Sequence, residues 1–135
     1  MAKAAANTTT STVELIDGSA EALPLEDHSV DTVVSTWTLC SIPDVQRALQ
    51  EMRRVLRTGG TLLFVEHGEA PESNVARWQH RLDPLWTRLA GGCHLDRPID
   101  TLIAEAGFAM DRLDTAYMEG PKLLTFLYEG SAHPR

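Results

Sequence analysis

The most constraining feature of the sequence is a strand–helix–strand unit between residues 30 and 65. Residues 32–36 and 61–65 are β-prone runs without alternation, which is typical of strands covered on both faces. Between them the apolar residues recur at helical spacing and form one stripe, made of Val45, Ala48, Leu49, Met52, Val55 and Leu56. Pro43 and Asp44 suit the first turn of this helix, and Gly59-Gly60 follow its end. The sequence therefore predicts a βαβ unit in a parallel sheet.

Further elements are predicted on both sides of this unit. Residues 13–16 form a short β-prone run closed by a turn signal, Asp17-Gly18. From residue 75 to residue 89 the apolar positions keep helical spacing around Pro84, which predicts either one bent helix or two short ones. Pro98 opens another helix, and Gly107 ends it.

The last part of the chain predicts a pair of strands. Residues 109–117 and 122–129 are β-prone and flank Gly120-Pro121, and so short a connection implies an antiparallel pair. Residues 131–135 are expected to form a loose tail. The fold class is therefore α/β, with parallel strands plus a C-terminal antiparallel pair.

Composition excludes several classes of protein. The 135 residues suit one domain. The formal charge of -7 disfavours binding to nucleic acid, because it repels phosphate backbones. Two cysteines, Cys40 and Cys93, are too few for a disulfide framework, and no apolar run is long enough for a membrane span or a signal peptide. We therefore expect a cytoplasmic protein without stable membrane insertion.

Three loops are the candidate sites for chemistry. In an open α/β sheet, ligands bind beyond the carboxyl ends of the strands, which selects residues 17–21, 36–41 and 66–68. Each loop carries short polar side chains, which suit a small polar cofactor. No Gly-rich phosphate loop of the Walker or dinucleotide type occurs, so a dinucleotide-binding oxidoreductase is disfavoured.

The same loops carry a family resemblance. The stretches Gly18-Ser-Ala-Glu-Ala-Leu-Pro24, Ile42-Pro-Asp44, Glu51-Met-Arg-Arg-Val-Leu-Arg-Thr-Gly-Gly60 and Leu62-Leu-Phe-Val-Glu66 resemble class I S-adenosylmethionine (SAM)-dependent methyltransferases, in the subgroup that includes the UbiE-type quinone enzymes. The stretch Gly92-Cys-His-Leu-x-Arg97 is similar to a smaller branch that contains thiol methyltransferases. The resemblance implies a Rossmann-like methyltransferase sheet and methyl transfer from SAM to a small, possibly apolar acceptor.

The resemblance also implies roles for individual residues. Ser19 and Ala20 would contact the adenine, and Glu21 would organise their loop. Thr36 would lie beside the methionine part of SAM, and Trp37 would follow it towards the substrate. Two residues at the end of the next strand, Glu66 and His67, would face the transferred methyl and are the candidate catalytic residues. A base is needed only where the acceptor must lose a proton, as a thiol or hydroxyl does.

Two parts of the family pattern are not found in this sequence. They are the Gly-rich loop under the methionine part of SAM and the acidic residue that binds the ribose, which the resemblance places before Met1. We therefore expect a helix remnant and linker at residues 1–12, a partial SAM-methyltransferase domain at residues 13–130 and a tail at residues 131–135.

Plainer interpretations stay open for several residues. His67 is either a base or a histidine hydrogen-bonded at the sheet edge. Cys93-His94 lacks a second ligand pair with zinc spacing, so we expect no metal site and regard Cys40 and Cys93 as packing residues. Trp78 and Trp86 either line an apolar acceptor pocket or only cover the sheet.

The alternative function is a non-catalytic remnant or interaction module. In the family's sheet order the missing strands leave the inner edge of residues 30–35 without a partner. An exposed edge invites pairing, so we expect either that residues 13–16 move beside it or that two chains form a homodimer there.

Overall fold

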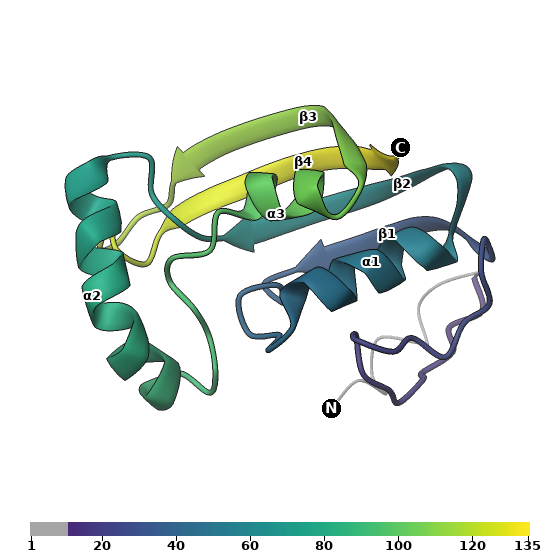
Figure 1. The fold of residues 1–135 in the computed structure, drawn as a ribbon, viewed down its shortest axis with the longest axis horizontal. Coiled ribbons are helices and arrows are strands. Elements are labelled where there is room, and N and C mark those ends of the chain that lie inside the picture. The colour runs from purple at the N-terminus through teal and green to yellow at the C-terminus, as the bar shows by residue number, and fades with distance from the viewer. Residues whose placement is uncertain (1–10) are drawn as a thin grey trace.

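The computed structural model describes residues 11–135 and contains one four-stranded sheet (Figure 1). The strand order is β1-β2-β4-β3. The strands are β1 (Val30–Thr36), β2 (Leu56–His67), β3 (Phe108–Tyr117) and β4 (Phe126–Pro134). β1 is parallel to β2, whereas β4 is antiparallel to both β2 and β3. The expected α/β class, with parallel strands and a C-terminal antiparallel pair, is confirmed.

Three helices accompany the sheet: α1 (Val45–Val55), α2 (Ser73–Leu89) and α3 (Ile99–Glu105). α1 and α3 lie on one face of the sheet, and α2 stands beyond the carboxyl ends of β1 and β2 (Figure 1). α1 begins where the Asp44 carboxylate accepts a hydrogen bond from the Arg47 N–H at 3.0 Å. Its buried residues Ala48, Leu49, Met52 and Val55 belong to the predicted stripe. No helix in the described part of the chain is long and apolar enough to span a membrane.

The hydrophobic core lies on the face of the sheet that α1 and α3 cover. Leu62 and Phe64 of β2 are almost wholly buried there, at 0% and 1% exposure. On the opposite face, Val34 of β1 and its register partner Leu63 remain 65% and 42% exposed. The prediction that these strands are covered on both faces is therefore wrong for the described residues, because their helices pack on one side.

The helix around Pro84 is continuous. α2 runs through Pro84 although proline cannot donate the hydrogen bond of that turn. The reason lies in its tertiary anchors: the wholly buried Gln79 donates to the carbonyls of Gly68 and Leu123 and accepts from the Ala70 N–H. Packing decides between the two predicted alternatives in favour of one helix.

Two predictions at the ends of the domain are wrong. Residues 13–16 form no strand, and the side chains of Val13, Leu15 and Ile16 are about half exposed or more. The free edge of β1 therefore has no strand from residues 13–16 beside it. Residues 131–134 are not a loose tail but the end of β4, where Ser131 and Ala132 pair with both β2 and β3. The predicted helix remnant falls mainly at residues 1–10, outside the described residues.

The close packing around Gly130 predicts that a larger side chain at this position destabilises the sheet. A Cβ atom at this position would lie 2.0 Å from the Arg112 carbonyl oxygen and 3.0 Å from the Phe64 ring. Because a backbone oxygen in a strand cannot move aside easily, Gly130→Ala should lower the free energy of unfolding by about 3 kcal/mol. Ser131→Ala, one residue on, should change it by less than about 0.5 kcal/mol. Denaturant unfolding measures both, and equal effects of the two variants would contradict the packing described here.

Candidate functional site

The loop after β1 is held by a buried carboxylate at the end of β2. Glu66 has no exposed surface. One of its oxygens accepts a hydrogen bond from the Ser35 hydroxyl at 2.7 Å, and the other accepts from the N–H groups of Thr38 and Leu39 at 2.9 and 3.2 Å. This carboxylate, expected to face the transferred methyl, is thus engaged by the protein. Its geometry suits a residue that positions the loop.

Burial controls the protonation of Glu66. Desolvation raises the pKa of this carboxyl above its ordinary value, and the three hydrogen bonds together with nearby His67 oppose the shift without cancelling it. The folded chain therefore binds the Glu66 proton more tightly than the unfolded chain does.

Trp37 has an unusual backbone conformation at the turn of this loop. Its φ angle is 51°, in the left-handed region that bulky residues rarely occupy. Its N–H donates to the Val65 carbonyl at 3.0 Å, and its indole stacks on the His67 imidazole with ring centres 5.3 Å apart. The turn places an aromatic side chain, 46% exposed, at the carboxyl ends of the two parallel strands.

An open cleft of about 440 Å³ lies beside Trp37. Its lining residues come from two segments near the carboxyl end of β1. They are Ser19, Ala20 and Glu21 before that strand, and Trp37, Thr38, Ser41, Ile42 and Pro43 after it. The cleft thus brings together four of the five predicted cofactor-binding residues. Its mixture of an indole, small apolar side chains and hydroxyl groups fits a nucleoside better than a metal ion.

The first wall of this cleft is tied to α1. Glu21 accepts a hydrogen bond from the Asp44 N–H at 2.7 Å through its side chain, and its carbonyl accepts from the Arg47 side chain at 3.0 Å. The Ser19 hydroxyl accepts from the Glu21 N–H, which closes a tight turn. Glu21 therefore organises the loop in this structure.

Thr36 is not in the cleft. It lines a groove on the uncovered face of the sheet, together with Val34, Leu63 and Val65. Its carbonyl accepts a hydrogen bond from the Thr38 hydroxyl at 2.8 Å. The structure thus separates Thr36 from the other predicted cofactor residues, because alternate residues of a strand face opposite sides.

His67 lies at the end of β2 and is 8% exposed. Its Nε2 is 3.2 Å from the Cys93 sulfur. Burial raises the pKa of the Cys93 thiol to about 11, and neighbouring Cys40 adds to this effect. Burial also acts against ionisation of Cys40, but hydrogen bonds with His67, Ser41 and Cys93 outweigh it and lower the pKa of that thiol. Both cysteines are free thiols.

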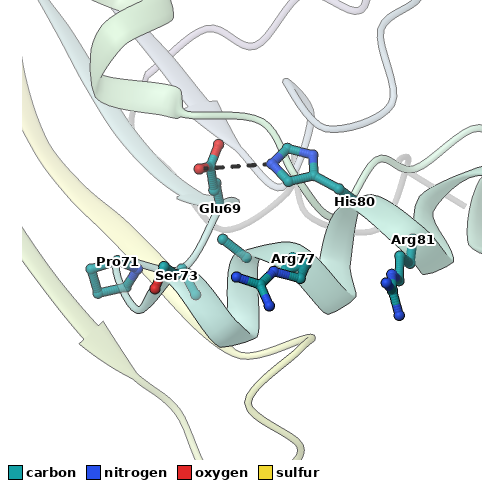
Figure 2. A pocket seen from close by; sticks show the side chains of 8 residues that line it. Glu69, Pro71, Ser73, Arg77, His80 and Arg81 are labelled. Carbon is teal, nitrogen blue, oxygen red and sulfur yellow. Dashed lines mark ion pairs between the residues drawn. The ribbon is translucent and has the colours of Figure 1, made fainter.

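Two further pockets lie around α2. Figure 2 shows the larger one, of about 560 Å³, where Arg77, His80 and Arg81 of α2 accompany Glu69. The other, about 190 Å³, is almost wholly apolar. Its lining includes Trp86, which the sequence suggested for an acceptor pocket, together with Leu82, Leu85 and Leu89 of the same helix. Trp78 is outside that pocket and 54% exposed, with the Arg81 guanidinium 5.6 Å from its ring centre.

Sequence reasoning missed the residues that brace the loops. The Arg97 guanidinium donates to the carbonyls of Leu39 and Ile42. Asp83 of α2 accepts from the Leu95 N–H at 2.7 Å and lies 2.8 Å from the His94 ring. These contacts join segments that are distant in sequence, so no local sequence pattern predicts them. Arg97 does fall in the stretch that resembles the smaller methyltransferase branch.

Comparisons with known proteins agree with the geometry. Residues 1–64 match the methyltransferase domain family. The chain is 42% identical over 91 residues to thiol S-methyltransferase TMT1B of Rattus norvegicus, covering 67% of this chain and 37% of that protein. It is 40% identical over 65 residues to ubiquinone/menaquinone biosynthesis C-methyltransferase UbiE of Hahella chejuensis, covering 48% of this chain and 26% of that protein. The chain thus spans well under half the length of these relatives.

A solved structure shows the same fold. The SAM-dependent methyltransferase of Methanosarcina mazei superposes with a TM-score of 0.70 at 22% identity, covering 98% of this chain and 75% of that one. At this identity the likeness concerns the fold. The four-stranded sheet described above is therefore an arrangement found within methyltransferase domains.

The hydrogen bonds by which Glu66 holds Ser35, Thr38 and Leu39, called the Glu66 clamp below, predict unequal effects of two substitutions. Glu66→Ala leaves the Ser35 hydroxyl and two backbone N–H groups without their acceptor and should lower the free energy of unfolding by about 3 kcal/mol or more. Glu66→Gln retains an oxygen for the loop and should cost less. Denaturant unfolding of both variants tests this, and equal losses would contradict the clamp.

The raised pKa of Glu66 predicts a pH dependence with a definite sign. Protonation of Glu66 favours the folded state, so this contribution is complete below the ordinary pKa of 4.5 and is lost as pH rises towards the folded pKa. Relative to Glu66→Gln, the unmodified chain should therefore lose stability as pH rises above the ordinary pKa of 4.5. Unfolding curves of both proteins at several pH values measure this difference in stability. The other titratable groups are the same in both proteins, so their contributions cancel in the difference. A difference that does not vary with pH would contradict it.

Proposed function

Because this chain belongs to the class I methyltransferases by sequence and fold, we propose that it serves SAM-dependent methyl transfer to a small, apolar acceptor, with a thiol as the first candidate. The thiol is suggested by the named activity of the rat relative. Since the chain spans 37% of that relative, we propose that it supplies one part of the enzyme. Two free cysteines and the acidic charge suit a cytoplasmic setting.

The observation that carries this proposal is the cleft at the carboxyl end of β1. Trp37 is separated in sequence from Ser19, Ala20 and Glu21, but all four line one cavity, at the place where open α/β sheets bind ligands. Small side chains at Ser19 and Ala20 leave room for a planar base, and the Ser41 and Thr38 hydroxyls offer polar contacts to a sugar. The residues present thus fit the adenosine part of SAM.

The chain's own residues would act mainly by positioning. SAM supplies an electrophilic sulfonium methyl group, so holding donor and acceptor in line removes much of the entropic barrier. Glu66 fixes the loop that carries Trp37, and Trp37 shields one side of His67. We propose Glu66 as a positioning residue and keep His67 as the candidate base for an acceptor that must lose a proton. We assign Thr36 no contact with the cofactor, because it ends β1 on the side away from the cleft.

A test of the cofactor cleft uses S-adenosylhomocysteine, the demethylated product, as the probe. Ala20→Leu places a larger side chain in the cleft and should weaken binding at least about tenfold, or about 1.4 kcal/mol. Leu25→Ala, on the same loop but outside the cleft, is the matched control and should bind as the unmodified chain does. Isothermal titration gives the affinities, and circular dichroism checks that both variants are folded.

Two outcomes would count against the cleft as the cofactor site. One is binding that Ala20→Leu leaves unchanged. The other is no detectable binding of the product by the unmodified chain, which would mean that this part of the enzyme does not hold the cofactor by itself.

A second candidate function is an interaction module that pairs two copies of the chain. The observation that favours it is β1, which ends the sheet and has β2 as its one partner strand among the described residues. Val34 and Leu63, exposed side by side, form an apolar patch next to this edge. Backbone groups at such an edge are free to continue the sheet into another molecule.

Light scattering distinguishes this second candidate. If β1 forms the interface, the unmodified chain should have the mass of a dimer, and Val34→Lys should shift it towards the monomer because edge lysines oppose strand pairing. Leu113→Lys, on the opposite edge strand, should leave the mass unchanged. A monomer at all concentrations would exclude the dimer.

A further inference from the structure

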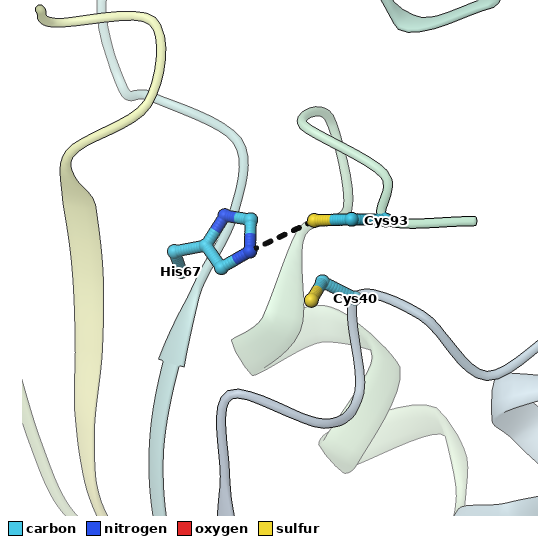
Figure 3. A group of neighbouring side chains, drawn as sticks. All are labelled: Cys40, His67 and Cys93. Carbon is cyan, nitrogen blue, oxygen red and sulfur yellow. Dashed lines mark hydrogen bonds between the residues drawn. The ribbon is translucent and has the colours of Figure 1, made fainter. Parts of the chain in front are cut away.

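Three potential metal ligands converge near the cofactor cleft without being part of its lining. They are Cys40 in the loop after β1, His67 at the end of β2 and Cys93 between α2 and α3 (Figure 3). Their ligand atoms all lie within 4.8 Å of one another, and the Cys93 sulfur is 3.2 Å from His67 Nε2. In a tetrahedral zinc site, bond lengths of about 2.0 to 2.3 Å place such ligand atoms about 3.5 to 4 Å apart. Small side-chain adjustments would therefore suffice.

The two cysteine segments are tied directly to each other. The N–H of His94, next to Cys93, donates to the carbonyl of Cys40 at 2.7 Å. This backbone hydrogen bond fixes the separation of the two cysteines independently of any contact between their sulfurs.

Each cysteine segment is also anchored to the rest of the fold. The Glu66 carboxylate and the Arg97 guanidinium both bind Leu39, which precedes Cys40. Asp83 binds the Leu95 N–H and contacts the His94 ring, which holds the segment that follows Cys93. The third ligand, His67, is oriented by its stacking on Trp37. The cluster is thus preorganised by contacts that involve none of the three ligand atoms.

The donor set selects the class of cation. Thiolate and imidazole ligands favour zinc over magnesium or calcium, which prefer oxygen. Two thiolates and a neutral imidazole around a divalent ion give no net charge, which suits a site where Cys40 and His67 are 3% and 8% exposed. Cys93 is more exposed than the other two ligands.

We infer that Cys40, His67 and Cys93 form a zinc-binding site with three protein ligands, and an ion bound there would occupy His67 Nε2 and so replace the role of His67 as a base. Sites of this ligand count keep a fourth position for water or another small molecule. Trp37 and Ser41 contact the cluster and also line the cofactor cleft, so the ion would lie next to that cleft. The sequence expectation of no metal site arose because three segments supply one ligand each, which leaves no paired spacing to recognise.

The second acidic and histidine group near α2 is a weaker candidate. Asp83, His94 and Asp96 also lie within 4.8 Å of one another. However, both oxygens of Asp83 are already engaged by the Leu95 N–H and the His94 ring. Asp83 therefore serves as a brace for the Cys93 segment.

Zinc titration of the reduced, metal-free chain tests the inference. Competition with a chromophoric chelator should show one zinc ion per chain, and Cys40→Ala, Cys93→Ala and His67→Ala should each weaken binding at least about tenfold. Two matched controls should retain the affinity: His133→Gln removes a surface histidine, and Asp96→Asn disables the second group. Cobalt in place of zinc should give the charge-transfer absorption of thiolate coordination, and both cysteine variants should reduce it.

A second measurement avoids dependence on the folding of the variants. In the unmodified chain, saturating zinc should slow the alkylation of both Cys40 and Cys93, because metal-bound thiolates are shielded. Absence of stoichiometric zinc binding, unchanged affinity in the cysteine variants or alkylation that zinc does not slow would each overturn the inference. So would a Cys40–Cys93 disulfide in the purified chain whose reduction yields no zinc binding.

Discussion

The buried carboxylate of Glu66 is the interaction on which the site depends. It lies at the end of β2 and accepts hydrogen bonds from the end of β1 and from the first N–H groups of the following loop. A charged acceptor buried without such donors would be strongly destabilising, so the loop and the carboxylate require each other. The left-handed turn at Trp37 sits inside this clamp, which explains how a strained bulky residue is held there.

Trp37, Cys40 and His67 each lie next to a residue of this clamp in the sequence. Trp37 faces the cleft and covers His67, while Leu39 carries the chain on to Cys40. Two further residues hold these loops in place: Arg97 binds the loop of Cys40, and Asp83 binds the segment that follows Cys93. The proposed cofactor cleft and the proposed zinc site thus share one rigid support, and a change at Glu66 would disturb both.

The sequence predicted the parts of the fold that depend on local pattern. The stripe of α1 follows from helical periodicity, and the structure shows it from Val45 to Val55 with Asp44 at its start. The predicted end before Gly59-Gly60 is wrong, because Leu56 and these glycines belong to β2. The loop of Ser19, Ala20 and Glu21 followed from the family resemblance, and these residues do meet Trp37 in one cleft. The prediction of a strand at residues 13–16 was wrong, because β propensity makes a strand only where a partner edge is available. The prediction of a loose tail at residues 131–134 was also wrong, because pairing with two strands orders this segment.

The sequence by itself determined the α/β class, the parallel βαβ unit and the loops that carry the candidate site, because these depend on residues near one another along the chain. Only the tertiary structure decided that Glu66 clamps the loop, that Thr36 faces away from the cleft and that Cys40, His67 and Cys93 converge. These outcomes depend on which side of a strand each residue faces and on contacts between segments far apart in sequence. Neither leaves a periodic signal in the sequence, so they emerge only when the sheet and its loops pack together.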